Sequence, residues 1–307
     1  MSKSFYIKLI IIFLIASCGG KDDYIIPDDI ITIDPLKIDR KVLVIGIDGF
    51  RSDAMQETFT PFMYNLSQKN NVYFNSTHIV EGITYSGPNW SSILTGVHMN
   101  KHNVTDNSFD NHNYAQYPPF FHYMEAINED IYTASIVNWI PINAYIASDY
   151  TDYASLDPID DAMVFESAKQ MLLDSNVDVL FLQFDESDGA GHAHGFSPLI
   201  EAYTDTLNSL DTYSQALFEI IENKRTNGED WLFMIVSDHG GEGTSHGDAN
   251  DPNINQTIFF AQHPELTFKA NCCYISSQAD LAPTILDFIG ISSTQFSNNT
   301  DGNTIIN

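Results

Sequence analysis

Four runs of apolar residues stand out along the chain: KVLVIGI at 41–47, YTASIVN at 132–138, VDVLFLQF at 177–184 and WLFMIVS at 231–237. Runs that are apolar at nearly every position are typical of strands buried on both faces of a parallel sheet. Amphipathic helical spacing is found between and after these runs, at 60–70, 120–129, 158–175, 198–224 and 278–289. Because strands alternate with helices, the pattern predicts an α/β fold, with a mostly parallel central sheet and helices on both faces.

The N-terminal segment has the pattern of an export signal. Lys3 and Lys8 precede an apolar run from Leu9 to Ile15 that is too short to span a bilayer, and IASC followed by two glycines resembles a bacterial lipobox. We therefore expect residues 1–17 to be a lipoprotein signal peptide and Cys18 to be lipidated; a plain secretory signal is the alternative. Both readings predict an extracytoplasmic protein, and the lipobox predicts one anchored in a bacterial cell envelope, periplasmic or surface-exposed.

The segment after Cys18 mixes Gly, Pro and Asp without a sustained period, as expected of a flexible tether at 18–39. We expect a single folded domain over 40–307. Cys272 and Cys273 are the only other cysteines. Because adjacent cysteines form only a strained disulfide, we interpret them as structural bystanders.

The chain is strongly acidic, with 41 Asp and Glu against 13 Lys and Arg and a formal net charge of −28. Such a charge repels nucleic acid and anionic membrane surfaces. It therefore excludes a sequence-tolerant nucleic-acid binder and is typical of a solvated surface.

Aspartates and histidines follow three of the predicted strands. Asp48 comes directly after the first strand, DESDGAGHAHG (185–195) follows the third and SDHGGEGTSHGD (237–248) follows the fourth. Ligands of open parallel sheets bind beyond the carboxyl ends of the strands. The three clusters are therefore expected to converge at one edge of the sheet.

Within the second cluster, Asp188 and His192 are four residues apart, so both can reach one metal ion if the segment is helical. Asp185 is a rival to Asp188 because it lies directly at the strand end, but the spacing to His192 favours Asp188. In the third cluster the DHGG turn can direct both Asp238 and His239 at one centre.

His246, seven residues after His239, can fold back to supply a third position. Mixed Asp and His ligands suit zinc or manganese better than calcium, which prefers oxygen alone. Six such ligands would fit two divalent ions. Two ions about 3.5–4 Å apart can stabilise the attacking and the leaving oxygen of a phosphoryl displacement.

The stretch YSGPNWSSILTG (85–96) places Ser86 just before Gly-Pro, where a helix is expected to begin. Backbone N–H groups at a helix start bind anions, and a hydroxyl there can attack what those groups hold. A neighbouring metal ion can lower the pKa of that hydroxyl.

The combination of these motifs resembles the alkaline phosphatase superfamily, and most closely its nucleotide pyrophosphatase/phosphodiesterase branch. The resemblance runs in order over 41–291, and the motifs that carry it are VLVIGIDGFRSD, SGPNWSSILTG, TDN, DGAGHAHG, SDHGG and QADLAPTILDFIGI. It implies an alkaline phosphatase-like fold with two zinc ions. It implies that one ion is held by Asp188, His192 and His246. It implies that the other ion is held by Asp48, Asp238 and His239.

By the same resemblance Ser86 is the nucleophile and forms a covalent phospho-enzyme that water hydrolyses. A threonine is common at this position in that branch, and serine keeps the hydroxyl. Asn107 in VTDNSF matches an asparagine whose amide binds a phosphoryl oxygen, assisted by the backbone N–H of Gly87.

Three alternatives remain at this point: a sulfatase, a phosphomonoesterase of the same superfamily and a non-catalytic surface binding protein. The sulfatase signature shares the spacing of Ser86 and Pro88, but Trp90 occupies its arginine position. A monoesterase needs a positive group for the extra phosphate charge, and cations are few near the motifs; Arg51 is interpreted as structural. A small phosphodiester or nucleotide-like substrate is therefore favoured, by a metal-dependent phosphodiesterase or nucleotide pyrophosphatase.

Overall fold

The computed structural model describes residues 34, 37, 39–127, 130–270, 273–296 and 299–307. The predicted signal peptide, Cys18, most of the predicted tether and Cys272 lie outside these residues. Among the described residues, no helix has both the length and the apolar character needed to cross a bilayer.

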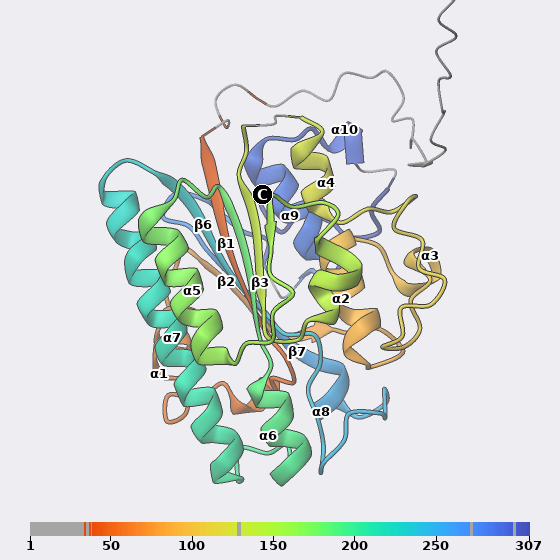
Figure 1. The fold of residues 1–307 in the computed structure, drawn as a ribbon. Coiled ribbons are helices and arrows are strands. Elements are labelled where there is room, and N and C mark those ends of the chain that lie inside the picture. The colour runs from red at the N-terminus through yellow and green to blue at the C-terminus, as the bar shows by residue number, and fades with distance from the viewer. Residues whose placement is uncertain (1–33, 35–36, 38, 128–129, 271–272, 297–298) are drawn as a thin grey trace, which may run out of the picture.

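The centre of the molecule is a seven-stranded sheet with the order β2-β7-β6-β1-β5-β3-β4 (Figure 1). β1 lies in the middle and pairs in parallel with β5 and β6, while β5 pairs in parallel with β3, and β3 with β4. β7 is antiparallel to both β6 and β2. The predicted mostly parallel sheet is confirmed. The strand bounds are β1 Arg40–Ile47, β2 Val72–Ile79, β3 Thr133–Val137, β4 Tyr153–Ala154, β5 Val179–Phe184, β6 Asp230–Val236 and β7 Gln256–Gln262.

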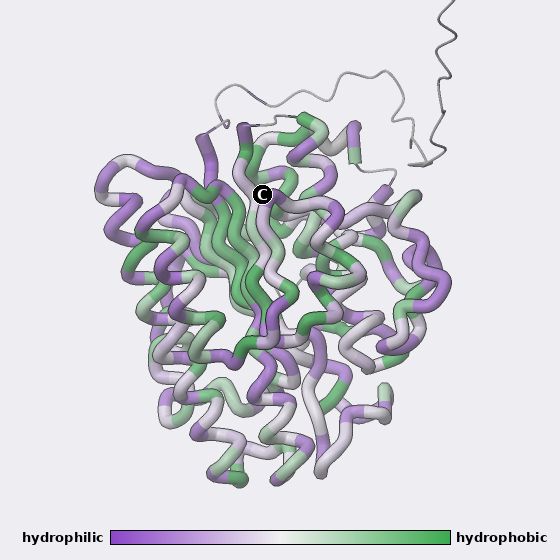
Figure 2. Tube along the Cα trace, viewed as in Figure 1, coloured by the Kyte–Doolittle hydropathy of each residue, from purple (hydrophilic) through white to green (hydrophobic). Residues whose placement is uncertain are grey.

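Helices cover both faces of the sheet, as predicted, because each central strand is apolar on both sides (Figure 2). Along β1, Val42 and Val44 pack into the core beneath α2, α4 and α9, whereas Leu43 and Ile45 pack into the core beneath α1, α5 and α7. The helices of the first face are α2 Ser86–Thr95, α4 Phe120–Glu125 and α9 Leu281–Ile289. Those of the second face are α1 Pro61–Ser67, α5 Asp161–Asp174 and α7 Glu201–Thr226.

Shorter elements complete the fold. They are η1 Ser52–Ala54, α3 Met99–His102, the π-helical η2 Ile142–Ala147, α6 Glu186–His194, α8 Pro252–Asn255, η4 Gln278–Asp280 and α10 Ser293–Phe296. Of these, α6 matters most for the site, because it begins directly after β5.

The ends of β1, β5 and β6 lie side by side. Ile47 is opposite Phe184 in the parallel register, and Gly46 is opposite Val236. Asp48, Asp185 and Asp238 follow these ends within one or two residues. The topology therefore brings the loops after β1, β5 and β6 to one edge of the sheet, where α6 and α8 also lie (Figure 1).

Candidate active site

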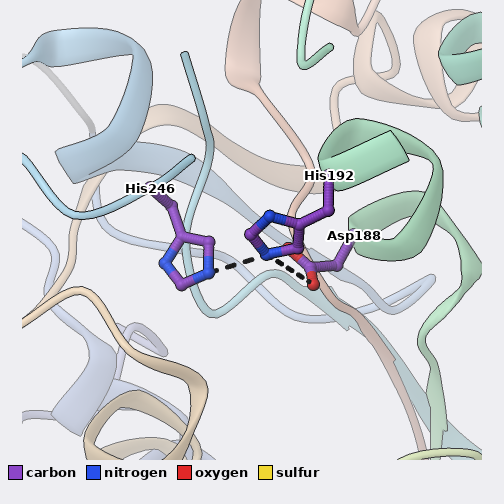
Figure 3. A group of neighbouring side chains, drawn as sticks. All are labelled: Asp188, His192 and His246. Carbon is purple, nitrogen blue, oxygen red and sulfur yellow. Dashed lines mark ion pairs between the residues drawn. The ribbon is translucent and has the colours of Figure 1, made fainter. Parts of the chain in front are cut away.

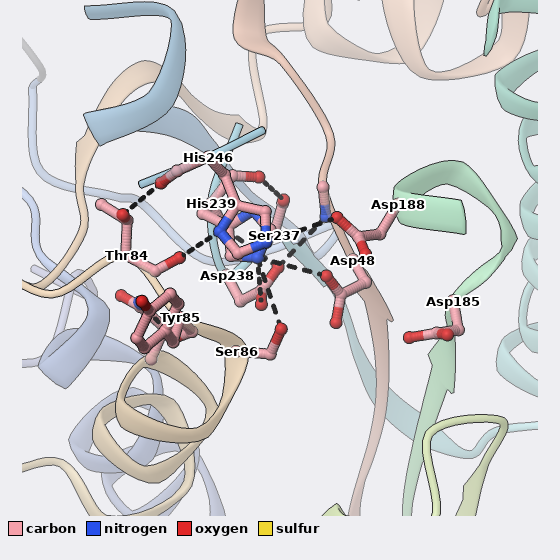
Figure 4. Close-up of polar contacts among 12 residues, drawn as sticks. Asp48, Thr84, Tyr85, Ser86, Asp185, Asp188, Ser237, Asp238, His239 and His246 are labelled. Atoms are coloured by element: carbon pink, nitrogen blue, oxygen red, sulfur yellow. Dashed lines mark hydrogen bonds and ion pairs between the residues drawn. The ribbon is translucent and has the colours of Figure 1, made fainter. Parts of the chain in front are cut away.

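Asp48, Asp238 and His239 form a buried group at this edge. Their exposed fractions are 1%, 0% and 0%. His239 Nε2 lies 3.4 Å from Asp48 Oδ1 and 3.3 Å from Asp238 Oδ2 (Figure 4). One ligand atom from each residue lies within 4.8 Å of the other two. The spacing suits three ligands of one metal ion.

Each carboxylate of this group has one oxygen held by the protein and one without a partner. Asp48 Oδ2 accepts from Trp90 Nε1 at 3.0 Å, and Asp238 Oδ1 accepts from the N–H groups of Gly49 at 3.2 Å and His239 at 2.9 Å. Asp48 Oδ1 and Asp238 Oδ2 are buried without a hydrogen-bond partner. A buried anionic oxygen that lacks a partner is costly, and a cation satisfies it.

Charge repulsion adds to this cost. Burial, followed by the charges of Asp238 and Asp188, raises the pKa of Asp48 well above its usual range. Burial and the charge of Asp188 also raise the pKa of Asp238 well above its usual range. The donor set therefore fits a divalent cation, because a positive charge at this point would relieve the repulsion among the carboxylates.

Asp188, His192 and His246 form a second, more open group (Figure 3). Asp188 and His192 lie one turn apart on α6, and Asp188 Oδ2 is 3.3 Å from His192 Nε2. Asp188 Oδ1 is 4.0 Å from His246 Nε2 and has no hydrogen-bond partner. Burial raises the pKa of Asp188 to about 7. The side chain of His192 is 45% exposed, so this group faces solvent whereas the first is enclosed.

The three histidines of the two groups are oriented in the same way. Each Nδ1 lies 2.8–2.9 Å from a backbone carbonyl, and since a carbonyl only accepts, each Nδ1 carries the proton. The pairs are His192 with Thr244, His239 with Gly240 and His246 with Thr84. With the proton on Nδ1, the neutral form of each ring presents the lone pair of Nε2, which is the form that binds a metal. Burial also lowers the pKa of His239 and of His246, which favours the neutral form.

Ser86 connects the first group to the helix start. It is the first residue of α2, it is 7% exposed, and its Oγ lies 3.4 Å from His239 Nε2. The rings of His239 and His246 stack with centroids 3.9 Å apart, so the two groups are neighbours. The structure thus brings together all six predicted ligands and the predicted nucleophile (Figures 3 and 4).

The predicted phosphoryl-binding residues are arranged differently from the expectation. The N–H of Gly87 donates to Asn107 Oδ1 at 2.8 Å, so it orients Asn107 rather than pointing at a ligand. Because Oδ1 accepts this bond, Nδ2 is the end of the Asn107 amide that remains as a donor. The backbone N–H of Gly87 therefore orients the Asn107 side chain and does not itself face a ligand.

We expect the substitution Gly87→Ala to displace the Asn107 loop. A Cβ at this position would lie 2.6 Å from the Asp106 carbonyl oxygen, which is closer than real contacts allow, and 3.0 Å from Asn107 Oδ1, which is tighter than most contacts. We expect kcat/KM to fall by roughly 10-fold or more, the effect of misplacing one oriented donor. Gly82→Ala is the matched control, because nothing lies within 4 Å of its added Cβ. Equal activity of the two variants in a steady-state assay would contradict this role of Gly87.

Asp185, the rival of Asp188, lies outside both groups. Its Oδ1 accepts from Gln183 Nε2 at 3.1 Å. Gln183 Nε2 also lies 3.4 Å from Asp48 Oδ2. Asp185 is therefore linked to the ligand Asp48 through Gln183. Asp188, by contrast, lies close enough to His192 and His246 to share a metal ion with them.

Some supporting residues were missed by the sequence reasoning. Trp90 is fully buried and holds Asp48 through its indole N–H. Gln278 Nε2 donates to the carbonyls of Ser237 and Asp238, which fixes the turn that carries the ligands. Both residues stand in the quoted motifs, but spacing alone does not reveal which backbone or side-chain atom a buried donor reaches.

Arg51 is structural, as expected. It is 5% exposed and donates to Asp53, Glu242 and the carbonyl of Phe196. All of its described partners belong to the protein, so its charge is neutralised within the fold.

Comparison with known proteins gives a family match over most of the chain. The sequence model of the type I phosphodiesterase / nucleotide pyrophosphatase family matches residues 42–281. Bovine bis(5'-adenosyl)-triphosphatase is 25% identical over 224 residues, which cover 65% of this chain and 47% of the relative. The chain thus spans about half the length of this curated relative.

Solved structures with 11–13% identity share the fold. Murine ectonucleotide pyrophosphatase / phosphodiesterase 5, in an inactive form with AMP, has a TM-score of 0.63 over 87% of this chain and 100% of its own. A 2-O GAG sulfatase has a TM-score of 0.65 over 83% and 71% of the two chains. The lipoteichoic acid synthase LtaP from Listeria monocytogenes has a TM-score of 0.60 over 90% and 78%. At these identities the likeness shows the fold alone.

Proposed function

Because the chain belongs to the type I phosphodiesterase / nucleotide pyrophosphatase family, within the alkaline phosphatase superfamily, we propose that it is a metal-dependent phosphoester hydrolase of the phosphodiesterase or pyrophosphatase type. One observation carries the proposal: Ser86 Oγ lies 3.4 Å from His239 Nε2, inside a set of carboxylate oxygens without partners and histidines with a free Nε2 lone pair.

Two divalent ions, zinc or manganese, fit this donor set. One would be held by Asp188, His192 and His246. The other would be held by Asp48, Asp238 and His239. When bound, the ions supply Lewis-acid stabilisation of the charge that develops on the attacking and leaving oxygens.

The proposed reaction uses Ser86, Asn107 and water. The Ser86 hydroxyl loses its proton to water, and its oxygen attacks phosphorus. The bond from phosphorus to the leaving oxygen breaks, and that oxygen takes a proton from water. The amide of Asn107 donates to a phosphoryl oxygen, and water then hydrolyses the phosphoserine to regenerate Ser86.

The charges around the site favour a diester over a monoester. Arg51 follows the first-strand aspartate, yet it is neutralised by Asp53 and Glu242 at 2.7 Å. Because Arg51 is paired, it does not supply the positive group that the second negative charge of a monoester needs, whereas a diester brings one charge only. We propose a small phosphodiester or nucleotide-like substrate, in line with the adenosyl compound and the AMP named for the two pyrophosphatase relatives.

The test is hydrolysis by the zinc-loaded protein of three nitrophenyl substrates: a phosphodiester, a phosphomonoester and a sulfate. We expect preference for the diester and loss of activity on chelation. Turnover of the sulfate would instead indicate a sulfatase, the class of one structural neighbour. Absence of turnover with two ions bound would indicate a binding protein.

We also propose export and lipid anchoring through Cys18, supported by the lipobox-like IASCGG sequence. Labelling with a radioactive fatty acid in a bacterial host checks this proposal. We expect label on the wild-type protein and none on Cys18→Ala.

A further inference from the structure

The first turn of α6 is held by a carboxylate from another helix. Asp161, the first residue of α5, is fully buried. It accepts the N–H of Asp185 at 2.8 Å and the N–H of Glu186 at 2.9 Å, one with each oxygen. Asn138 Nδ2, at the end of β3, donates to the same carboxylate at 2.8 Å. Asp161 thus satisfies N–H groups that would otherwise be unpaired at the start of α6.

This support is needed because α6 is a weak helix by itself. It has nine residues, and the side chain of its N-cap residue, Asp185, makes no capping hydrogen bond. Gly189 and Gly191 both lie within it, and glycine in a helix interior is destabilising relative to alanine. The position of this short helix must therefore come from its contacts with the rest of the fold.

We infer that Asp161 is a positioning residue for the open metal centre: by fixing the first turn of α6, it presents Asp188 and His192 to His246. This inference rests on the proposed two-metal function. The carboxylates of the enclosed centre are oriented differently, by Trp90 and Gly49, which lie outside α6. Ser187 of α6 contacts Asp48 too, but it donates to the backbone carbonyl and not to the carboxylate. Loss of the Asp161 carboxylate is therefore expected to affect one centre and spare the other.

The chain contains a matched control. Asp211 on α7 is 2% exposed and accepts the N–H groups of Phe62 at 2.8 Å and Met63 at 2.9 Å, at the start of α1. The chemistry is the same as at Asp161: a buried carboxylate caps another helix through two backbone N–H groups. α1 carries none of the proposed ligands, so Asp211→Asn reports the cost of losing such a cap without an effect on metal binding.

The experiment compares zinc binding by the full-length wild-type, Asp161→Asn and Asp211→Asn proteins, using equilibrium dialysis of the metal-free chains against zinc alone. In the amide variants, one oxygen acceptor becomes an N–H donor facing a backbone N–H. We expect the wild-type and Asp211→Asn proteins to bind two ions each, and the affinity at each centre to be the same in both proteins. For Asp161→Asn we expect one ion with wild-type affinity and a second weakened by about 10- to 100-fold, the usual effect of removing a group that orients ligands.

Equal zinc affinities in Asp161→Asn and Asp211→Asn would overturn the inference, whether both are unchanged or both weakened. A wild-type protein that binds fewer than two ions would overturn the two-metal proposal, and the inference with it. Should Asp161→Asn fail to fold, Asn138→Ala provides the second variant, since it removes one of the three hydrogen bonds to Asp161. We expect a smaller loss of affinity, again confined to one ion; unchanged affinity for both ions would contradict the inference.

Discussion

Replacing Ser86 by alanine is expected to reduce phosphodiester hydrolysis by about 10³-fold or more while leaving both metal ions bound. The hydroxyl is the attacking group in the proposed reaction, and loss of a nucleophile removes covalent catalysis altogether. Ser86 Oγ is not needed to hold the ligands, because each histidine is oriented by a backbone carbonyl. Steady-state kinetics, with zinc content measured on the same samples, checks both halves of this expectation.

The hydroxyls of Ser91 and Ser92 cannot replace that of Ser86. Ser91 and Ser92 lie on the same helix, but both are fully buried, and their hydroxyls donate to the Gly87 carbonyl and to Glu81 Oε1. Ser86→Thr is the informative control, since it keeps a hydroxyl and is expected to retain measurable activity. If Ser86→Ala hydrolysed the diester as fast as Ser86→Thr, attack by water rather than by the protein would be the better account.

The strands that the sequence predicted are those that appear as continuous apolar runs along the chain. β1, β5 and β6 are apolar at almost every position because helices cover both of their faces. β2 has no such signature, since it lies at the sheet edge and mixes polar with apolar residues in VYFNSTHI. β7 was also missed, because its apolar run is short, although it joins β2 to β6.

The candidate site divides in the same way. Asp48, Asp238 and His239 could be found because strand ends converge in parallel sheets, so position along the chain predicts position in space. Contacts between distant segments carry no comparable signal. The cap from Asp161 to α6 spans 24 and 25 residues, and the bond from Trp90 to Asp48 spans 42. Such pairs depend on how the layers pack, which a local pattern does not encode.

The substitution Asp238→Asn is expected to stabilise the metal-free protein while weakening metal binding at the enclosed centre. Burial and the charge of Asp188 raise the pKa of Asp238, so its ionised form is unfavourable in the fold above the carboxyl pKa of the unfolded chain. Asparagine keeps an oxygen for the N–H groups of Gly49 and His239 and removes the negative charge. We expect the melting temperature of the metal-free protein at pH 7 to rise by about 2–4 °C, the shift that 1 kcal/mol gives in a domain of this size.

At the other end of β6, replacing Asp230 by asparagine is expected to have the opposite effect on stability. Hydrogen bonds from His263 and Arg40 lower the pKa of Asp230, so its ionised form contributes stability above the carboxyl pKa of the unfolded chain. Asp230→Asn should therefore lower the melting temperature slightly, since the side chain is 40% exposed, and leave zinc binding unchanged. This control separates the general effect of removing a carboxylate from the specific effect at the site.

With zinc added, we expect the wild-type protein to become more stable than Asp238→Asn. The wild-type protein is expected to gain melting temperature with added zinc, because binding to the folded state alone stabilises it, whereas Asp238→Asn loses one ligand and part of that gain. We expect diester hydrolysis to fall by roughly 10²- to 10³-fold in this variant, the usual loss when one source of charge stabilisation is removed. A metal-free variant less stable than the wild type, or one with an undiminished response to zinc, would show that Asp238 is an ordinary buried carboxylate. Higher stability without metal, combined with lower activity and a smaller response to zinc, is the result expected of a ligand held under charge repulsion.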